Sequence, residues 1–277
     1  MKQEIDFIKF NPTQNMTILV KTYYPVEEYK HIASKIMSYD SVHAEQVGFI
    51  EKTVSDKAAA HLQMAGGEFC GNACMSMAAF IASEKKLKQY DMTEVLLEVS
   101  GSDKLIKCQV KKNEDEYYCQ VTMPIPKKIE QRTIMYEGCN LEIIIVRYHA
   151  FIHIVIEVEE LSNKVRKKAQ SFAKLLGVTL GANMIGILLY QSKTNELTPL
   201  IYVPHLDSMI WERGCGSGTA SLGAYLAWRK NGEIIAKIKQ PGGSITVVAK
   251  CHEGDITSLK IEGSVGIVAQ GKAYLEV

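Results

Sequence analysis

Hydrophobic and polar positions alternate in the first part of the chain in the manner of short strands. Residues 3–10 and 16–21 follow this two-residue period, which predicts a strand over each segment. Pro25 then opens a segment in which apolar residues return at helical spacing, namely Val26, Tyr29, Ala33, Ile36 and Met37. Short strands lead from this helix to a second helical segment, which begins at Cys70.

The second half of the chain repeats this order of elements. Residues 142–158 are rich in Ile and Val and predict strands, and residues 162–176 predict a helix that ends at Gly177. Two further strands, around 184–190 and 198–203, precede another helical segment, which begins at Cys215. The repeated order predicts two similar halves, each with strands and helices.

Two prolines mark the junction between these halves. The junction reads Met123-Pro124-Ile125-Pro126-Lys127, and its prolines suit a crossover segment better than the interior of a sheet. We therefore expect a domain boundary between residues 124 and 125.

Length and composition limit the function classes. A chain of 277 residues with 47% hydrophobic content can bury one large core or two modest ones, and a formal charge of +1 gives no electrostatic footprint for nucleic acid. The N-terminus has no apolar secretory core, and the sequence contains no run of about 18 apolar residues that would span a bilayer. We expect a cytoplasmic protein with neither a nucleic-acid partner nor a membrane partner.

The cysteines do not predict a disulfide scaffold or a metal site. The seven are Cys70, Cys74, Cys108, Cys119, Cys139, Cys215 and Cys251, an odd number with no pair at CxxC spacing. Cys74 lies one turn beyond Cys70 and suits helix packing. The four outside the two helical segments suit passive packing or exposed thiols.

Two of these cysteines stand at the start of a helix. Cys70-Gly71-Asn72-Ala73 opens one small-residue helix, and Cys215-Gly216-Ser217-Gly218-Thr219 opens another. A helix start offers unpaired backbone amides and the positive end of the peptide dipoles, so it binds a carboxylate and lowers a cysteine pKa from about 8.5. Glycine after each cysteine lets the backbone approach a substrate. One such motif is typical of a tight helix entry without a function, whereas two favour a pair of thiols that act together.

These motifs carry a family resemblance that runs over almost the whole chain. The carrying segments are Phe10-Asn11-Pro12-Thr13-Gln14-Asn15, Glu45-Gln46, Phe69-Cys70-Gly71-Asn72, the loop Cys215-Gly216-Ser217-Gly218-Thr219 and Gln240-Pro241-Gly242-Gly243-Ser244. The sequence resembles the cofactor-independent amino-acid racemases and epimerases of the diaminopimelate epimerase fold. Within that group it is most similar to the histidine racemases that feed staphylopine-type metallophore synthesis.

The resemblance implies an α+β fold with two pseudosymmetric domains. Each domain would be a β-barrel-like sheet around a central helix, with the active site in the cleft between the domains. The first domain would span residues 1–124 and the second residues 125–267, and the C-terminal strand, residues 268–277, would return to the first domain. The fold commonly forms a homodimer.

The resemblance also implies the chemistry, which is proton exchange at the α-carbon of an amino acid without pyridoxal phosphate or a metal. Cys70 and Cys215 would be the catalytic pair, one removing a proton from one face while the other delivers a proton to the opposite face. The backbone amides that would stabilise the negative charge on the substrate carboxylate are those of Gly71, Asn72, Gly216 and Ser217.

Further residues match positions with a role in the family. Asn15 and Gln46 would orient the substrate and the thiols, although such residues beside a strand also serve in turns and caps. His153 would adjust the thiol pKa values, or it is a satisfied core histidine. Glu212 would hold the substrate ammonium or tune Cys215, or it is a surface carboxylate. Arg213 lies so close to Cys215 that the sequence leaves open whether it enters the site.

The substrate is suggested by departures from the epimerase pattern. Two asparagines that bind the distal amino-carboxylate of diaminopimelate are replaced by Met64 and Phe151, and Asn183 remains. A charged group against such apolar surface is costly, whereas an imidazole fits it, so histidine is the leading substrate. The alternatives are a diaminopimelate epimerase or broad racemase, an isomerase of the phenazine-pathway type without paired thiols, and a non-catalytic amino-acid-binding protein.

Overall fold

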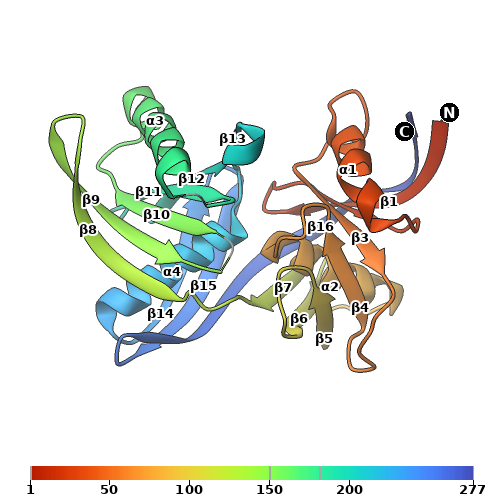
Figure 1. Ribbon diagram of the computed structural model, residues 1–277. Coiled ribbons are helices and arrows are strands. Elements are labelled where there is room, and N and C mark those ends of the chain that lie inside the picture. Colours follow the sequence, from red (N-terminus) through yellow and green to blue (C-terminus); the bar gives the residue numbers. More distant parts are fainter. Residues whose placement is uncertain (1, 150, 181, 277) are drawn as a thin grey trace. The chain divides into compact units, whose positions relative to one another are not determined.

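The computed structural model describes residues 2–149, 151–180 and 182–276, and the chain in it forms a mixed α/β fold with many strands and few helices. It divides into two compact units (Figure 1). Unit 1 comprises Met1–Met123 and Ile261–Val277, and unit 2 comprises Pro124–Lys260. Among the described helices, none combines the length and the apolar character needed to cross a membrane.

The strands of unit 1 pair in a closed ring. They are β1 (Lys2–Pro12), β2 (Thr17–Val20), β3 (Gln46–Glu51), β4 (Ala60–Met64), β5 (Met92–Val99), β6 (Ile106–Asn113) and β7 (Glu116–Thr122), paired in that order. The long strand β16 (Asp255–Glu276) follows β7 and pairs antiparallel with β1, from Lys2 opposite Glu276 to Pro12 opposite Val265. The predicted strands over residues 3–10 and 16–21 are confirmed as β1 and β2.

The helix α2 (Gly71–Glu84) contacts every strand of unit 1 from β1 to β7. Its buried residues include Ala73, Cys74, Ser76, Ala78 and Ala82. A helix without a polar face is stable only when it is covered on all sides, and small side chains let the strands come close. The composition of this segment therefore explains its burial.

The helix α1 (Tyr29–Met37) follows a short 3₁₀ turn, η1 (Val26–Glu28), for which Pro25 is the N-cap. The helix predicted to open at Pro25 is thus confirmed. One face of α1 is buried, and the Tyr29 ring stacks on Phe49 of β3 with ring centroids 3.7 Å apart.

Unit 2 also consists of paired strands and a few helices. Its strands are β8 (Lys128–Tyr136), β9 (Cys139–Arg147), β10 (Ile152–Glu157), β11 (Ile185–Gln191), β12 (Glu196–Val203), β14 (Glu233–Gln240) and β15 (Gly243–His252), paired in that order and then to β16. The short strand β13 (Ser208–Trp211) pairs with β12 after the turn η2 (Pro204–Leu206). The helix α4 (Gly216–Lys230) is buried along most of its length and contacts β9, β10, β11, β14 and β15.

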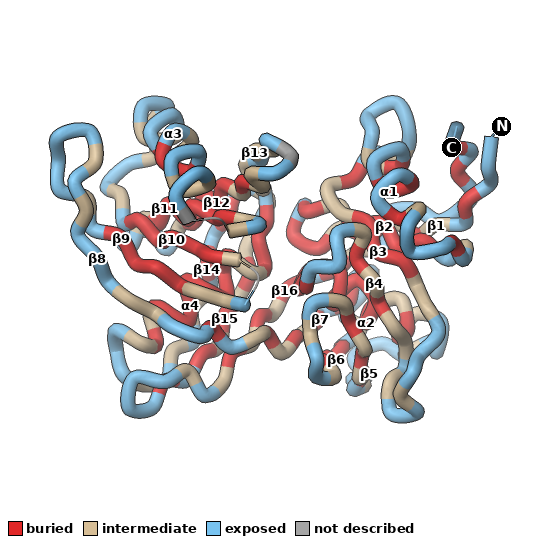
Figure 2. Tube along the Cα trace, viewed as in Figure 1, coloured by how far each residue is buried: buried red, intermediate tan, exposed pale blue. Residues whose placement is uncertain are grey.

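The second long helix of unit 2, α3 (Asn163–Leu180), packs on β11 and β12. Figure 2 shows its outer surface exposed, together with β8, while β10 and β11 are buried. The prediction that this helix ends at Gly177 is wrong. A methyl group at Gly177 would lie only 2.7 Å from Tyr202 Cε1, so the glycine provides space for close packing inside the helix.

Candidate active site

Cys70 lies between β4 and α2 and is the N-cap of α2, with φ −131° and ψ 111°. Its Sγ accepts a hydrogen bond from the Ala73 backbone amide at 3.3 Å. The thiol donates to Gln46 Oε1 at 2.7 Å, and Gln46 is the first residue of β3. The predicted partner Gln46 therefore holds the predicted catalytic thiol within unit 1.

Asn15 lies in the turn that joins β1 to β2 and is buried. Its backbone amide donates to the Pro12 carbonyl at 3.1 Å, and the turn carries the left-handed residues Thr13 and Gln14. The next residue, Met16, accepts a bond from the Gln46 amide at 3.2 Å. This bond joins the Asn15 turn to the strand start that holds Cys70.

Two further predicted residues of unit 1 are Asn72 on α2 and the pocket residue Met64 at the end of β4. Asn72 is 2% exposed, and its carbonyl accepts a bond from the Ser76 hydroxyl at 2.9 Å. Met64 is also 2% exposed and pairs with Gly48 of β3. A methyl group at Gly48 would lie 3.3 Å from Met64 Sδ, so Met64 is closely packed on this side.

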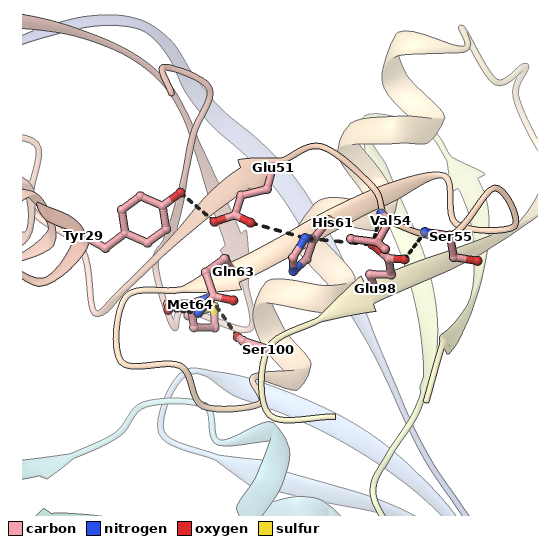
Figure 3. A network of polar contacts seen from close by, with 9 residues as sticks. All are labelled: Tyr29, Glu51, Val54, Ser55, His61, Gln63, Met64, Glu98 and Ser100. Atoms are coloured by element: carbon pink, nitrogen blue, oxygen red, sulfur yellow. Dashed lines mark hydrogen bonds and ion pairs between the residues drawn. The ribbon is translucent and has the colours of Figure 1, made fainter. Parts of the chain in front are cut away.

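The end of β5 fixes the loop that leads to Cys70. Ser100 Oγ accepts a bond from the Met64 amide at 2.9 Å, as Figure 3 shows, and donates to the Glu68 carbonyl at 2.8 Å. The next residue, Gly101, has φ +73°, and a methyl group there would lie 2.4 Å from Phe69 N. Ser100 and Gly101 thus hold the backbone immediately before the thiol. Neither residue was predicted from the sequence.

A second polar network in Figure 3 ties α1 to the strands of unit 1. The Tyr29 hydroxyl donates to Glu51 Oε1 at 2.7 Å, and His61 Nδ1 lies 3.3 Å from Glu51 Oε2. His61 Nδ1 also lies 3.9 Å from Glu98, which accepts a bond from the Val54 amide at 2.9 Å. The network links β3, β4 and β5, and so stabilises β4, which ends at Met64.

Cys215 is the N-cap of α4, with φ −108° and ψ 107°. Its Sγ accepts a bond from the Gly218 amide at 3.2 Å and lies 3.5 Å from the Ser217 hydroxyl. The two cysteines therefore share one local geometry. Each is an N-cap with an extended backbone, and its sulfur accepts a hydrogen bond from the backbone amide three residues ahead.

The surroundings of the Cys215 thiol favour its protonated form. Burial raises its pKa well above the ordinary value, and the adjacent Glu212 carboxylate raises it further, while Ser217 and the Gly218 amide act in the opposite direction. The prediction that the helix start lowers the cysteine pKa does not hold at Cys215, because burial and Glu212 together outweigh the helix-terminal amide. Glu212 lies beside the thiol, and Arg213 is exposed.

An aromatic cluster lies beside α4 and contains two predicted residues. His153, which is fully buried, places Nδ1 2.7 Å from Ser221 Oγ, and the Tyr148 hydroxyl lies 2.9 Å from the same oxygen. Phe151 stacks on Tyr148 with centroids 4.3 Å apart. Burial raises the pKa of Tyr148, the hydrogen bond to Ser221 acts in the opposite direction, and a thiolate at Cys215 would raise the pKa further.

Burial lowers the pKa of His153 to about 3, so its imidazole is neutral at physiological pH. A neutral ring cannot stabilise a thiolate by charge. His153 instead anchors Ser221 on α4, and Gly186 leaves room for the ring, since a methyl group there would lie 2.4 Å from His153 Cδ2.

Asn183 lies in the connection between α3 and β11 and is exposed. Its neighbour Met184 accepts a bond from the Ile152 amide at 3.2 Å, which places the Asn183 connection beside the Phe151 end of β10. Within the described parts of the chain, no group of three or more His, Cys, Asp or Glu residues is arranged to hold a metal ion.

Comparisons with known proteins identify one family. The family described as "Histidine racemase CntK N-terminal domain" matches residues 4–274. A histidine racemase of Staphylococcus aureus strain Mu50 is 37% identical over 279 residues, covering 99% of each chain. A histidine racemase of Fusobacterium nucleatum subsp. nucleatum is 31% identical, covering 99% of this chain and 98% of the relative.

Two solved structures have a similar fold at low sequence identity. A hydroxyproline epimerase from Agrobacterium vitis, with bound trans-4-hydroxy-L-proline, superimposes with a TM-score of 0.73 at 12% identity, covering all of this chain and 95% of that one. A probable proline racemase from Agrobacterium radiobacter K84 gives a TM-score of 0.71 at 10% identity, covering 96% and 92%. The fold is thus that of racemases and epimerases.

Proposed function

Because the chain belongs to the histidine racemase family, we propose that it interconverts L- and D-histidine with two cysteine thiols and no cofactor. The observation that carries the mechanism is the matched geometry of Cys70 and Cys215. Each sulfur caps a buried helix and accepts a hydrogen bond from the backbone amide three residues ahead. The Ala73 amide donates to Cys70 Sγ at 3.3 Å, and the Gly218 amide donates to Cys215 Sγ at 3.2 Å. An amide that donates to sulfur stabilises the thiolate, which is the basic form of the side chain.

In the proposed reaction the two thiols share one α-carbon. A thiolate takes the α-proton and becomes a thiol, the electron pair passes into the substrate carboxylate, and the second thiol returns a proton to the opposite face and becomes the thiolate. The configuration inverts and the two cysteines exchange roles. The reverse reaction then begins from the new thiolate.

Backbone amides are the proposed donors for the charge that forms on the carboxylate. At each helix start the N3 amide is bonded to the cysteine sulfur, and the next amide, of Cys74 or Thr219, is bonded to the cysteine carbonyl at 3.0 Å. The first two amides of each helix stand at the positive end of its peptide dipoles, where a carboxylate is favoured. These are the amides of Gly71, Asn72, Gly216 and Ser217, which we propose bind the substrate carboxylate.

We propose that Cys215 is the proton donor when the resting enzyme first reacts. Its thiol is buried beside Glu212, and both features favour the protonated form. Glu212 thus tunes Cys215, and Cys70 acts first as the base, once it has lost to solvent the proton that its thiol donates to Gln46 Oε1. His153 positions α4 through Ser221 rather than supplying charge.

The proposed substrate follows from the family and from the residues expected around its side chain. Met64 and Phe151 offer apolar surface, which suits an imidazole better than a distal amino-carboxylate. We propose Asn15 and Asn183 as further contacts, and a staphylopine-type metallophore pathway as the consumer of D-histidine. Two pseudosymmetric domains, each with a central helix, and a homodimer belong to the same proposal.

Incubation of the reduced enzyme in heavy water without added cofactor tests the substrate. We expect L-histidine to lose optical rotation and exchange its α-proton, with much slower exchange for diaminopimelate. Faster exchange with diaminopimelate would keep the thiol chemistry and reject histidine. Binding of histidine with no deuterium entering it would reject the enzyme function.

A further inference from the structure

The backbone of Cys215 is enclosed in a ring of three hydrogen bonds. The Cys215 amide donates to Gln240 Oε1 at 2.7 Å, and Gln240 Nε2 donates to Thr219 Oγ1 at 2.7 Å. The Thr219 hydroxyl then donates to the Cys215 carbonyl at 2.7 Å. One side chain thus fixes the peptide groups on both sides of the Cys215 α-carbon, directly and through Thr219.

This ring lies in a buried part of unit 2. Gln240 is 8% exposed, Cys215 is 3% exposed and Thr219 is fully buried. A buried polar group that loses its partner costs free energy, so the ring strongly favours one arrangement of these atoms. Gln240 is the last residue of β14, and the turn after it adds a further bond, from the Gly242 amide to the Arg213 carbonyl at 2.7 Å.

The ring also determines which backbone amides remain for a ligand. The Cys215 amide is bonded to Gln240, and the Gly218 amide is bonded to the Cys215 sulfur. The helix itself provides no acceptor for the amides of Gly216 and Ser217. The same bonds that set the thiol direction therefore set the proposed carboxylate donors.

We propose that Gln240 is a positioning residue, which holds the Cys215 thiol in its reactive direction by bridging the Cys215 backbone amide and the Thr219 hydroxyl. Its effect on proton transfer rests on the proposed function. Its effect on the Cys215 thiol does not, because that effect is measured without substrate.

The test replaces Gln240 with Met, which keeps the side-chain length and removes both hydrogen bonds. A displacement of about 1 Å at a reacting group costs about 100-fold in rate, so we expect kcat for histidine to fall by about 10- to 100-fold while KM changes by less than about threefold. Tyr136→Phe is the matched control. It removes the hydroxyl bond from β8 to the Lys168 carbonyl of α3, 3.3 Å long, in the same unit but on elements that carry no member of the Cys215 ring.

Iodoacetamide labelling of the reduced protein, quantified at each cysteine by mass spectrometry, reads the position of the thiol directly. We expect Gln240→Met to label Cys215 about 10-fold faster than wild type, because the loop loosens around a buried thiol, with Cys70 unchanged as the internal reference. Equal changes at both thiols would indicate general destabilisation and overturn the proposal. So would an unchanged Cys215 rate in a folded variant.

A second pair of variants covers the case in which Gln240→Met does not fold. Thr219→Val removes the hydroxyl that closes the ring, whereas Thr219→Ser retains it. We expect faster Cys215 labelling in Thr219→Val and a wild-type rate in Thr219→Ser, and equal rates in the two would overturn the proposal. If wild-type enzyme does not racemise histidine, the proposed function fails, while the labelling results still decide the role of Gln240.

Discussion

Replacement of Gly101 by Ala tests whether the backbone before Cys70 must stay where it is. A methyl group at this position would lie 2.4 Å from Phe69 N and 2.8 Å from the Glu68 carbonyl carbon. Ordinary contact begins at 3.4 Å, so the chain next to Cys70 must move by about 1 Å. A shift of that size at a catalytic group costs about 100-fold, and we expect kcat for histidine racemisation to fall by about that factor.

The variant also adds the strain of a side chain at φ +73°. Gly138→Ala is the matched control, because Gly138 has φ +74° and a methyl group there meets no atom within 4 Å. Each substitution should cost about 1–2 kcal/mol of stability for the left-handed backbone. Initial rates and thermal unfolding of both variants separate the effects. If folded Gly101→Ala keeps kcat within about twofold of Gly138→Ala, the reasoning about this loop is refuted.

Three further predictions concern the thiols and His153. Cys70→Ser or Cys215→Ser should each nearly abolish racemisation, because a serine hydroxyl is far less acidic than a thiol; a normal rate in either variant would exclude a catalytic role for that cysteine. Glu212→Gln should lower the pKa of Cys215, so that its iodoacetamide labelling begins at a lower pH than in wild type; an unchanged profile would contradict the tuning role. Because the folded pKa of His153 is about 3 and its ordinary value is 6.5, the unfolded chain binds its proton first, and stability should fall as pH falls from about 6.5 towards 3. Thermal unfolding of His153→Asn should lose this part of the pH dependence, and an equal slope in both proteins would contradict it.

Local patterns predicted most of the elements that carry the site. Strand alternation identified β1 and β2, and the cysteine motifs marked the residues at which α2 and α4 begin. The end of α3 could not be predicted from the sequence around it. Glycine usually stops a helix, but Gly177 is required inside α3 because Tyr202, on another element, fills the space beside it.

The contacts that hold the thiols depend on pairings far apart in the sequence. Gln240 reaches Cys215 from the end of β14, and Ser100 reaches Glu68 from the end of β5. No local sequence pattern predicts either of these two contacts. The protonation of Cys215 was also beyond sequence reasoning, because it depends on burial and on the orientation of Glu212 against the helix-terminal amides.

The central claim is that two thiols share one α-carbon, and the fate of the α-proton in the first minutes of reaction tests it most directly. Reduced enzyme is mixed with L-histidine in heavy water, and each enantiomer is isolated early and analysed for deuterium by mass spectrometry. Two separate acids predict that D-histidine carries deuterium while the remaining L-histidine does not, because the proton removed and the proton delivered belong to different thiols. Early deuterium in the remaining L-histidine at a level matching the product would contradict the account, because it would mean that one group both removes and returns the proton.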